Sequence, residues 1–283
     1  MADDAVSETT AAARLRLAEL GRADDRDIRP AEAALLVAGL GRPHKPVAAY
    51  LSYLAELSAE IRAAIGDGGD VERLAGALME VFGRRHRYRG DDRDDEDVSN
   101  TNLMDVIDRR RGVADAVGLV ALDAARGAGL AAEGLAFPVR FLLRLEDDCG
   151  RRAILDPCAG SAALDPPAMR ALLKAGLGLE AELEPAHYAA MGNRDMVVRL
   201  QTDTKLRLLR CGRVDLALAV VEATLLLAPG ETALWREAGL MHMRLDDHPG
   251  AVAALEQFVA RTTNAQARAR TLALLAEIKG HLT

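Results

Sequence analysis

The sequence predicts an α+β protein in which helices come first, a small antiparallel sheet follows, and the C-terminal part is again helical. Hydrophobic residues make up 50% of the chain and aromatic residues only 3%, and Ala, Leu and Arg, which are strong helix formers, are used heavily. A run of helical patterns precedes a run of strand patterns instead of alternating with it. Near the C-terminus, two segments repeat each other at an offset of 34 residues. These three observations carry the prediction.

Composition limits the class of protein and its partners. A chain of 283 residues is long enough for one large domain or two ordinary ones. Its net charge of −7 argues against a nucleic-acid binder, which needs clustered positive charge. Three cysteines without close pairing are typical of free thiols in a reducing compartment. The acidic start lacks a signal-peptide pattern, and no apolar run approaches the roughly 18 residues of a membrane span. We therefore expect a cytoplasmic protein without a membrane partner.

The first part of the chain predicts helices. Residues 1–28 are polar and rich in Ala, and we expect a disordered or weakly helical tail. Pro30 stands where the first turn of a helix tolerates proline. A second helix is predicted after Pro46, because its apolar residues recur at three- and four-residue steps until the glycine-rich stretch 66–69. A third helix follows, with Val71, Leu74, Leu78, Val81 and Phe82 on one face.

A charged stretch separates these helices from the predicted centre of the fold. Residues 84–97 are basic and then acidic, without the ligand spacing of a calcium loop, so we expect a solvated loop. Asn100 or Thr101 can cap a short helix. An alanine-rich helix from about 114 to 128 would let neighbouring backbone approach closely. Residues 135–145 and 152–155 then predict two strands joined by a turn at 147–150, and helix resumes after Pro167.

Two motifs carry a resemblance to known families. Val106-Ile-Asp-Arg-Arg-Arg-Gly112, with Gly129 seventeen residues after Gly112, resembles the nucleophile helix of transglutaminase-like (papain-like) proteins. The 34-residue repeat resembles tetratricopeptide hairpins. The residues that match the repeat pattern are Gly212, Ala217, Pro229, Trp235, Gly239, Ala251 and Phe258. Together these segments resemble the bacterial SirB-type family, which implies a polar tail at 1–28, a transglutaminase-like core at 29–190 and two repeats with a capping helix at 195–283.

The resemblance also implies a degenerate catalytic site. Ala114 stands at the nucleophile position, Arg140 at the position of the general base, and Asp156 at the third position. Relatives usually have Pro-Gly-His-Phe where this chain has Pro138-Val-Arg-Phe141. Acyl transfer needs a nucleophile and a base that accepts its proton. Alanine has no nucleophile, and arginine stays protonated at physiological pH. We therefore expect a protein that is not an enzyme.

Several candidate residues leave alternatives open. Cys149 or Cys158 could act as a relocated nucleophile, but the sequence places no histidine beside either thiol. Arg109, Arg110 and Arg111 could bind a carboxylate or phosphate with their forked donors, or pair with Asp105, Asp108 or Asp156, and pairing is favoured. Arg140 could likewise form a salt bridge with Asp156 or bind an anion, and the salt bridge is favoured. The cluster of Leu240, Met241, Met243 and Leu245 with Trp235 could be a binding face, but core is the better interpretation.

The function that follows is a protein-interaction or regulatory adaptor, whose repeats bind a protein or peptide. The alternative is a cysteine-dependent hydrolase or acyltransferase in which Asp156 orients the base. A regulator that acts through nucleic acid is disfavoured by the negative charge. His242 and His248 lack ligand partners at metal-binding spacing, and we expect no metal or other cofactor.

Overall fold

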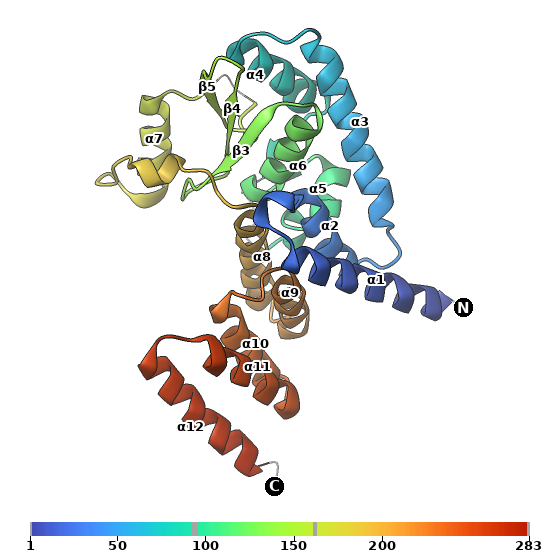
Figure 1. Cartoon of the computed structure of the whole chain (residues 1–283), viewed down its shortest axis with the longest axis vertical. Coiled ribbons are helices and arrows are strands. Elements are labelled where there is room, and N and C mark those ends of the chain that lie inside the picture. The colour runs from blue at the N-terminus through green and yellow to red at the C-terminus, as the bar shows by residue number, and fades with distance from the viewer. Residues whose placement is uncertain (1, 92–95, 161–162, 282–283) are drawn as a thin grey trace. The chain divides into compact units, whose positions relative to one another are not determined.

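The computed structural model describes residues 2–91, 96–160 and 163–281. The chain divides into two compact units (Figure 1). We call residues 24–200 the mixed unit, because it holds every strand that the structure describes, and residues 1–23 with 201–283 the helical-repeat unit. This division differs from the expected one. Residues 1–23 group with the C-terminal repeats, whereas we expected residues 1–28 to form a separate tail.

The helices of the mixed unit begin at residues suited to that position. Pro30 opens the first of the long helices, and the side chains of Asp70 and Asn102 accept backbone N–H groups of the helices that they precede. The helical elements are η1 (Asp25–Asp27), α2 (Pro30–Leu40), α3 (Val47–Ile65), α4 (Val71–Met79), its π-helical continuation η2 (Glu80–Arg85), η3 (Val98–Asn100), α5 (Leu103–Arg109), α6 (Ala114–Gly127), α7 (Pro166–Leu177) and η4 (Pro185–Tyr188).

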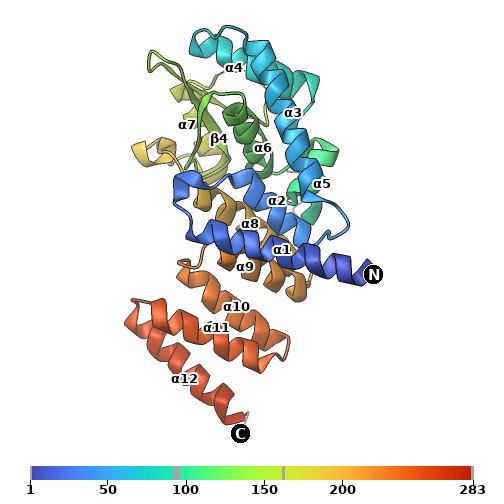
Figure 2. The same cartoon turned by 45° about the vertical axis from the view of Figure 1, so that its right-hand side comes forward.

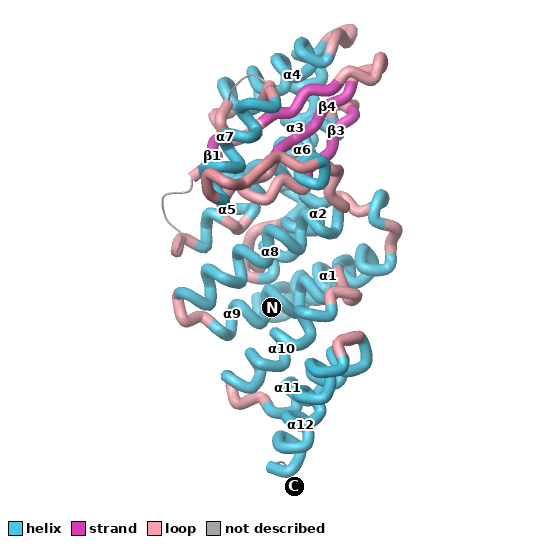
Figure 3. Tube along the Cα trace, turned by 90° about the vertical axis from the view of Figure 1, so that its left-hand side faces the viewer, coloured by secondary structure: helices cyan, strands magenta, loops and turns pink. Residues whose placement is uncertain are grey.

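The main sheet has three antiparallel strands in the order β3 (Ala131–Leu135), β4 (Leu142–Glu146) and β5 (Arg152–Leu155) (Figure 3). Leu143 pairs with Gly134 on one side and with Leu155 on the other. A second, two-residue parallel pair joins β1 (Arg89–Gly90) to β2 (Arg111–Gly112). The α+β class and the antiparallel sheet agree with the sequence prediction.

The strand boundaries differ from those expected. The single strand predicted at 135–145 is interrupted, because residues 136–141 form a loop with bends at 138–140. Pro138 lacks the N–H that a strand ladder needs, which favours this break. The strand β3 was missed, because its sequence Ala-Ala-Glu-Gly-Leu has little of the alternating apolar and β-branched pattern that indicates a strand.

Helix α6 is the centre of the mixed unit. It contacts β3 and β4 on one side and α3 on the other (Figures 1 and 2). Phe141 fixes the approach of helix and sheet, since a Cβ on Gly118 of α6 would lie 2.2 Å from its ring and a Cβ on Gly134 of β3 would lie 2.7 Å from it. On the α3 side, a Cβ on Gly127 would lie 2.4 Å from Ser58 Oγ. The glycines allow α6 to lie close to both neighbours.

The basic part of the charged stretch is ordered structure and not the solvated loop predicted for 84–97. Arg84 and Arg85 end η2. Tyr88 is buried, and its ring stacks on Phe82 at 4.4 Å between centroids. Tyr88 anchors this stretch by burying its ring, whereas the neighbouring Arg87 and Arg89 are exposed. Residues 92–95, in the acidic part, lie outside the described residues.

The helical-repeat unit contains α1 (Ala2–Arg22), α9 (Val214–Leu227), α10 (Thr232–Arg244), α11 (His248–Arg261) and α12 (Ala265–His281), and α8 (Asn193–Arg210) enters it at residue 201. Helix α1 lies beside α9 (Figure 2). Its Leu17 and Leu20 are buried, and a Cβ on Gly21 would lie 2.1 Å from the carbonyl oxygen of Leu226. The N-terminal segment is therefore a packed helix, because these apolar residues find a partner that is distant in the sequence.

Candidate functional site

Ala114, at the expected nucleophile position, is the first residue of α6 and is half-buried. The preceding Gly112 is required by close packing, since a Cβ there would lie 2.4 Å from Val106 and 2.6 Å from the carbonyl oxygen of Asn100. The helix start that would hold a reactive side chain is thus built tightly, but the side chain at this position is a methyl group.

The loop that contains Arg140 is tied to the same helix start by Arg199 of α8. The Arg199 guanidinium donates to the carbonyl oxygen of Phe137 at 2.8 Å, and its Nε lies 2.9 Å from a carboxylate oxygen of Asp115. Asp115 follows Ala114 directly, and Phe137 is fully buried. One arginine therefore connects the first turn of α6 to the loop between β3 and β4.

Arg140 and Asp156 come together. Arg140 Nη1 lies 2.6 Å from Asp156 Oδ2, and the exposed fractions of the two side chains are 28% and 2%. The other carboxylate oxygen of Asp156 accepts the backbone N–H of Cys158 at 2.8 Å. A buried carboxylate needs such partners. The arrangement gives the Asp156 carboxylate a cationic partner and supplies no group at Arg140 that could accept a proton.

Gly90 and Asp91 connect the segment after Asp156 to the segment before Ala114 through backbone hydrogen bonds. Gly90 of β1 donates to the carbonyl oxygen of Cys158 at 3.5 Å, and Asp91 donates to that of Gly112 at 2.8 Å. A Cβ on Gly90 would lie 3.3 Å from the Cys158 sulfur. Cys158 is half-buried against this strand, whereas Cys149 is exposed in the turn between β4 and β5.

The histidines with described contacts have neighbours other than these thiols. His86 contacts Tyr53, Glu60 and Arg110. His187 accepts the backbone N–H of Glu184, and His248 contacts the carbonyl oxygen of Asp246. Among the histidines whose side chains the structure describes, none hydrogen bonds to a cysteine. Within the described ranges, no three His, Cys, Asp or Glu side chains form a group that could hold a metal ion.

The three consecutive arginines 109–111 point to three different environments. Arg109 pairs with Asp97 at 3.0 Å and with the side-chain oxygen of Asn100 at 2.6 Å. Arg111 pairs with Asp91 at 3.3 Å. Arg110 has the left-handed backbone conformation (φ 58°) and lies against the rings of Tyr53 and Tyr88. This divergence follows from the end of α5, where the helical periodicity stops.

The carboxylates expected to bind these arginines are used elsewhere. Asp105 pairs with Arg42, and Asp108 pairs with Lys45 at 2.7 Å. The sequence expectation of pairing therefore applies to Arg109 and Arg111, but with other acids than the three that we named. Nothing in the spacing along the chain marks Asp91 or Asp97 as their partners, because the contact depends on how the segment 89–100 folds back on α5.

The Asp97–Arg109 pair predicts a pH dependence of stability. Burial raises the pKa of Asp97, but hydrogen bonds from Ser99 and from Arg109 outweigh it, so the pKa is below its ordinary value. The stabilisation is thus present above the unfolded-state pKa of about 4 and is lost as the pH falls through the lower folded-state pKa. Because the pair is partly exposed, we expect Asp97→Asn to cost less than about 1 kcal/mol at pH 7. Urea unfolding from pH 7 to pH 2 should show wild type and variant converging, and a constant difference would contradict the assignment.

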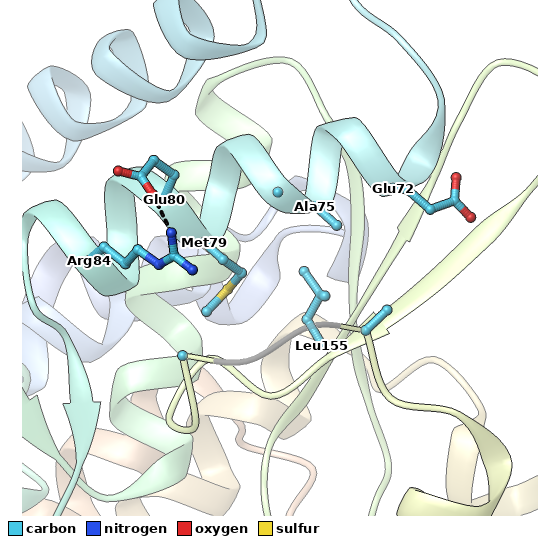
Figure 4. Close-up of a pocket in the computed structure, with 9 residues that line it drawn as sticks. Glu72, Ala75, Met79, Glu80, Arg84 and Leu155 are labelled. Atoms are coloured by element: carbon cyan, nitrogen blue, oxygen red, sulfur yellow. Dashed lines mark hydrogen bonds and ion pairs between the residues drawn. The ribbon is translucent and has the colours of Figure 1, made fainter.

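A cavity of about 460 Å³ lies between the α4–η2 helix and the end of β5 (Figure 4). Met79 and Leu155 face each other across it, and Glu80 and Arg84 form an ion pair of 3.3 Å at its edge. Its lining residues are Glu72, Ala75, Gly76, Met79, Glu80, Arg84, Leu155, Gly160 and Ala163. Nothing in the sequence indicates this cavity, because its walls come from segments about 80 residues apart.

The repeat residues in the C-terminal helices make the contacts that hold paired helices together. Trp235 Nε1 donates to the carbonyl oxygen of Pro229 at 3.0 Å, and the Arg261 guanidinium lies 5.1 Å from the centre of its ring. A Cβ on Gly239 would lie 2.6 Å from Leu255. Ala217, Ala251 and Phe258 are buried, and Gly212 has a φ of 70° in the turn before α9.

The cluster expected to be core is core only in part. Met241 is buried, whereas Leu240 and Leu245 are 37% and 40% exposed. His242 is held by Asp247 at 2.8 Å and lies 3.4 Å from Glu222. His242 thus connects α10 to α9. Leu240 and Leu245 contribute exposed apolar surface.

The fold and the site together define a class of protein. A small antiparallel sheet packs on a central helix, the Arg140–Asp156 pair lies beside it, and helical repeats occur in the same chain. The chain belongs to the transglutaminase-like superfamily, whose family model matches residues 48–202, and a tetratricopeptide repeat model matches residues 205–276. The resemblance to SirB-type proteins is confirmed by relatives of that name.

Two relatives illustrate the similarity. A UPF0162 protein of Vibrio cholerae serotype O1 is 27% identical over 211 residues, which cover 75% of this chain and 78% of the relative. Protein SirB1 of Salmonella typhimurium is 28% identical over 157 residues, covering 56% of this chain and 58% of the relative. None of the helices in the described part of the chain combines the length and apolar character that a membrane crossing requires.

Proposed function

We propose that this chain is a non-catalytic cytoplasmic adaptor, in which the transglutaminase-like unit is a scaffold and the repeats bind a protein or peptide. The Arg140–Asp156 pair is the observation that carries the proposal. A cysteine transferase or hydrolase needs a thiolate and a base that takes its proton. Ala114 and Arg140 supply neither, and the buried carboxylate is neutralised by the arginine.

Exposed leucines in the repeats support binding of a partner. Leu206 on α8 and Leu240 on α10 are 48% and 37% exposed. They lie 34 residues apart, which is one repeat, so stacked repeats present them on the same face. Apolar side chains in a repeated exposed position are suited to an apolar segment of another protein.

Capture experiments with matched variants test the adaptor role. The full chain should be used, because a truncation near residue 195 would remove α9, against which α1 packs. We expect a partner captured by the wild type to be lost from a Leu206→Ser, Leu240→Ser variant. The control is Leu216→Ser, since Leu216 is 39% exposed but lies on α9. Equal capture by all three proteins would contradict binding through this face.

The catalytic alternative has its own test. A hydrolase or acyltransferase that uses Cys149 or Cys158 would react with cysteine-directed activity probes and turn over amine or peptide substrates. We expect no turnover. Turnover that disappears in a Cys149→Ala, Cys158→Ala variant would replace the adaptor proposal by the enzymatic one.

A further inference from the structure

Arg110 is the centre of a polar cluster in the mixed unit that the adaptor role does not use. Its guanidinium carbon lies 4.5 Å from the ring centre of Tyr53 and 5.3 Å from that of Tyr88. Arg110 Nη1 lies 3.3 Å from His86 Nδ1 and 3.4 Å from the Tyr88 hydroxyl. The cation is thus held between aromatic rings and is fixed at one nitrogen.

The acids near this cluster are paired with other groups. Glu60 lies 3.0 Å from His86 Nε2 and 3.9 Å from Arg85. Asp108 pairs with Lys45 and accepts a hydrogen bond from Tyr50. Arg110 has no carboxylate partner among the described residues, and burial lowers its pKa. Because arginine stays protonated even so, the cluster contains one positive charge that pairs with no acid in the described part of the chain.

The remaining donors of Arg110 form an open fork. Nε and Nη2 have no hydrogen-bond acceptor within the part of the chain that the structure describes. Burial and the nearby charge of Asp108 raise the pKa of Tyr88, so its hydroxyl remains a neutral donor to Tyr53. The backbone at Arg110 is left-handed, a conformation that non-glycine residues adopt at a cost. The side chain is therefore held in place with its forked edge unused.

We propose that the forked edge of Arg110 binds a carboxylate, with Tyr53 and His86 beside it. The planar fork matches the two oxygens of a carboxylate, and one unneutralised positive charge balances one negative charge. A phosphate dianion fits less well, because the single positive charge of Arg110 balances only one of its two negative charges. The carboxylate can be a chain end or an acidic side chain.

Titration of the full chain with small carboxylates tests the site. The Nε–H resonances of ¹⁵N-labelled arginine side chains should be followed at constant ionic strength, with acetate, an N-acetylated peptide with a free C-terminus, its amide, and an amidated peptide containing Glu as probes. We expect a saturable shift of one resonance, which is absent in Arg110→Gln. Because neither variant keeps that resonance, acetate binding by Arg110→Gln and Arg110→Lys is followed through backbone amide shifts, and we expect it to be at least about tenfold weaker than in the wild type. Comparison of the peptides separates a chain end from an acidic side chain.

The matched control is Arg89→Gln, because Arg89 is exposed on β1 and its side chain makes no ring contact or hydrogen bond among the described residues. Its backbone N–H donates to the carbonyl oxygen of Arg110 at 3.2 Å, and the substitution keeps this bond. Acetate binding in Arg89→Gln should stay within about twofold of the wild type. The wild-type resonance shift does not depend on any variant folding. The proposal is overturned if acetate gives no saturable shift, if Arg110→Gln binds acetate like the wild type, or if inorganic phosphate binds more tightly than acetate.

Discussion

Replacing Arg140 by alanine is expected to lower the free energy of unfolding by about 2–3 kcal/mol at pH 7, because it leaves the carboxylate of Asp156 buried without its cation. Asp156 is 2% exposed at its side chain, and only the backbone N–H of Cys158 would remain of the partners described above. Urea or guanidinium unfolding of the wild type and the variant measures the difference. The value lies below the roughly 3–5 kcal/mol typical of a fully buried pair, because Arg140 itself is 28% exposed.

The Arg152–Glu146 pair provides a control for this prediction. Its nitrogen-to-oxygen distance is also 2.6 Å, but its side chains are 57% and 39% exposed. Arg152→Ala should therefore cost less than about 1 kcal/mol, because water replaces the lost partner. Equal losses in the two variants would show that burial of Asp156 does not decide the strength of the Arg140 contact.

Substituting Gly118 by alanine is expected to destabilise the protein by about 2 kcal/mol, although alanine is the better helix former by about 1 kcal/mol. The new Cβ would lie 2.2 Å from the Phe141 ring, which is itself 1% exposed and cannot move into solvent without losing its burial. Thermal or denaturant unfolding gives the sign directly, and a stabilised variant would mean that α6 and the loop can separate without cost.

Gly76→Ala is the matched control for this substitution. Gly76 also lies inside a helix, α4, but nothing is within 4 Å of the Cβ that it would gain. Alanine should therefore stabilise the protein by about 0.5–1 kcal/mol through helix propensity alone. Opposite signs at the two glycines would separate the effect of close packing from that of helix propensity.

The repeats and the central helix could be predicted from the sequence, because both depend on local patterns. The 34-residue offset places Ala217 and Ala251 in equivalent buried positions. The small residues of α6 indicated close approach, and Gly118 and Gly127 provide it. The strand β3 could not be recognised, because it lacks apolar alternation. The packing of α1 could not be recognised either, because its apolar residues are buried by contact with α9, which is distant in the sequence.

The sequence by itself determined which chemical groups are present: an alanine at 114 and an arginine at 140, the positions that we propose for a lost nucleophile and base, and an aspartate after the last strand. Only the tertiary structure decided their partners. Arg140 reaches Asp156, Arg109 reaches Asp97, and Arg110 lies between two tyrosine rings. The reason is that residue type fixes charge and hydrogen-bonding capacity locally, whereas the contact of two side chains depends on how distant segments pack.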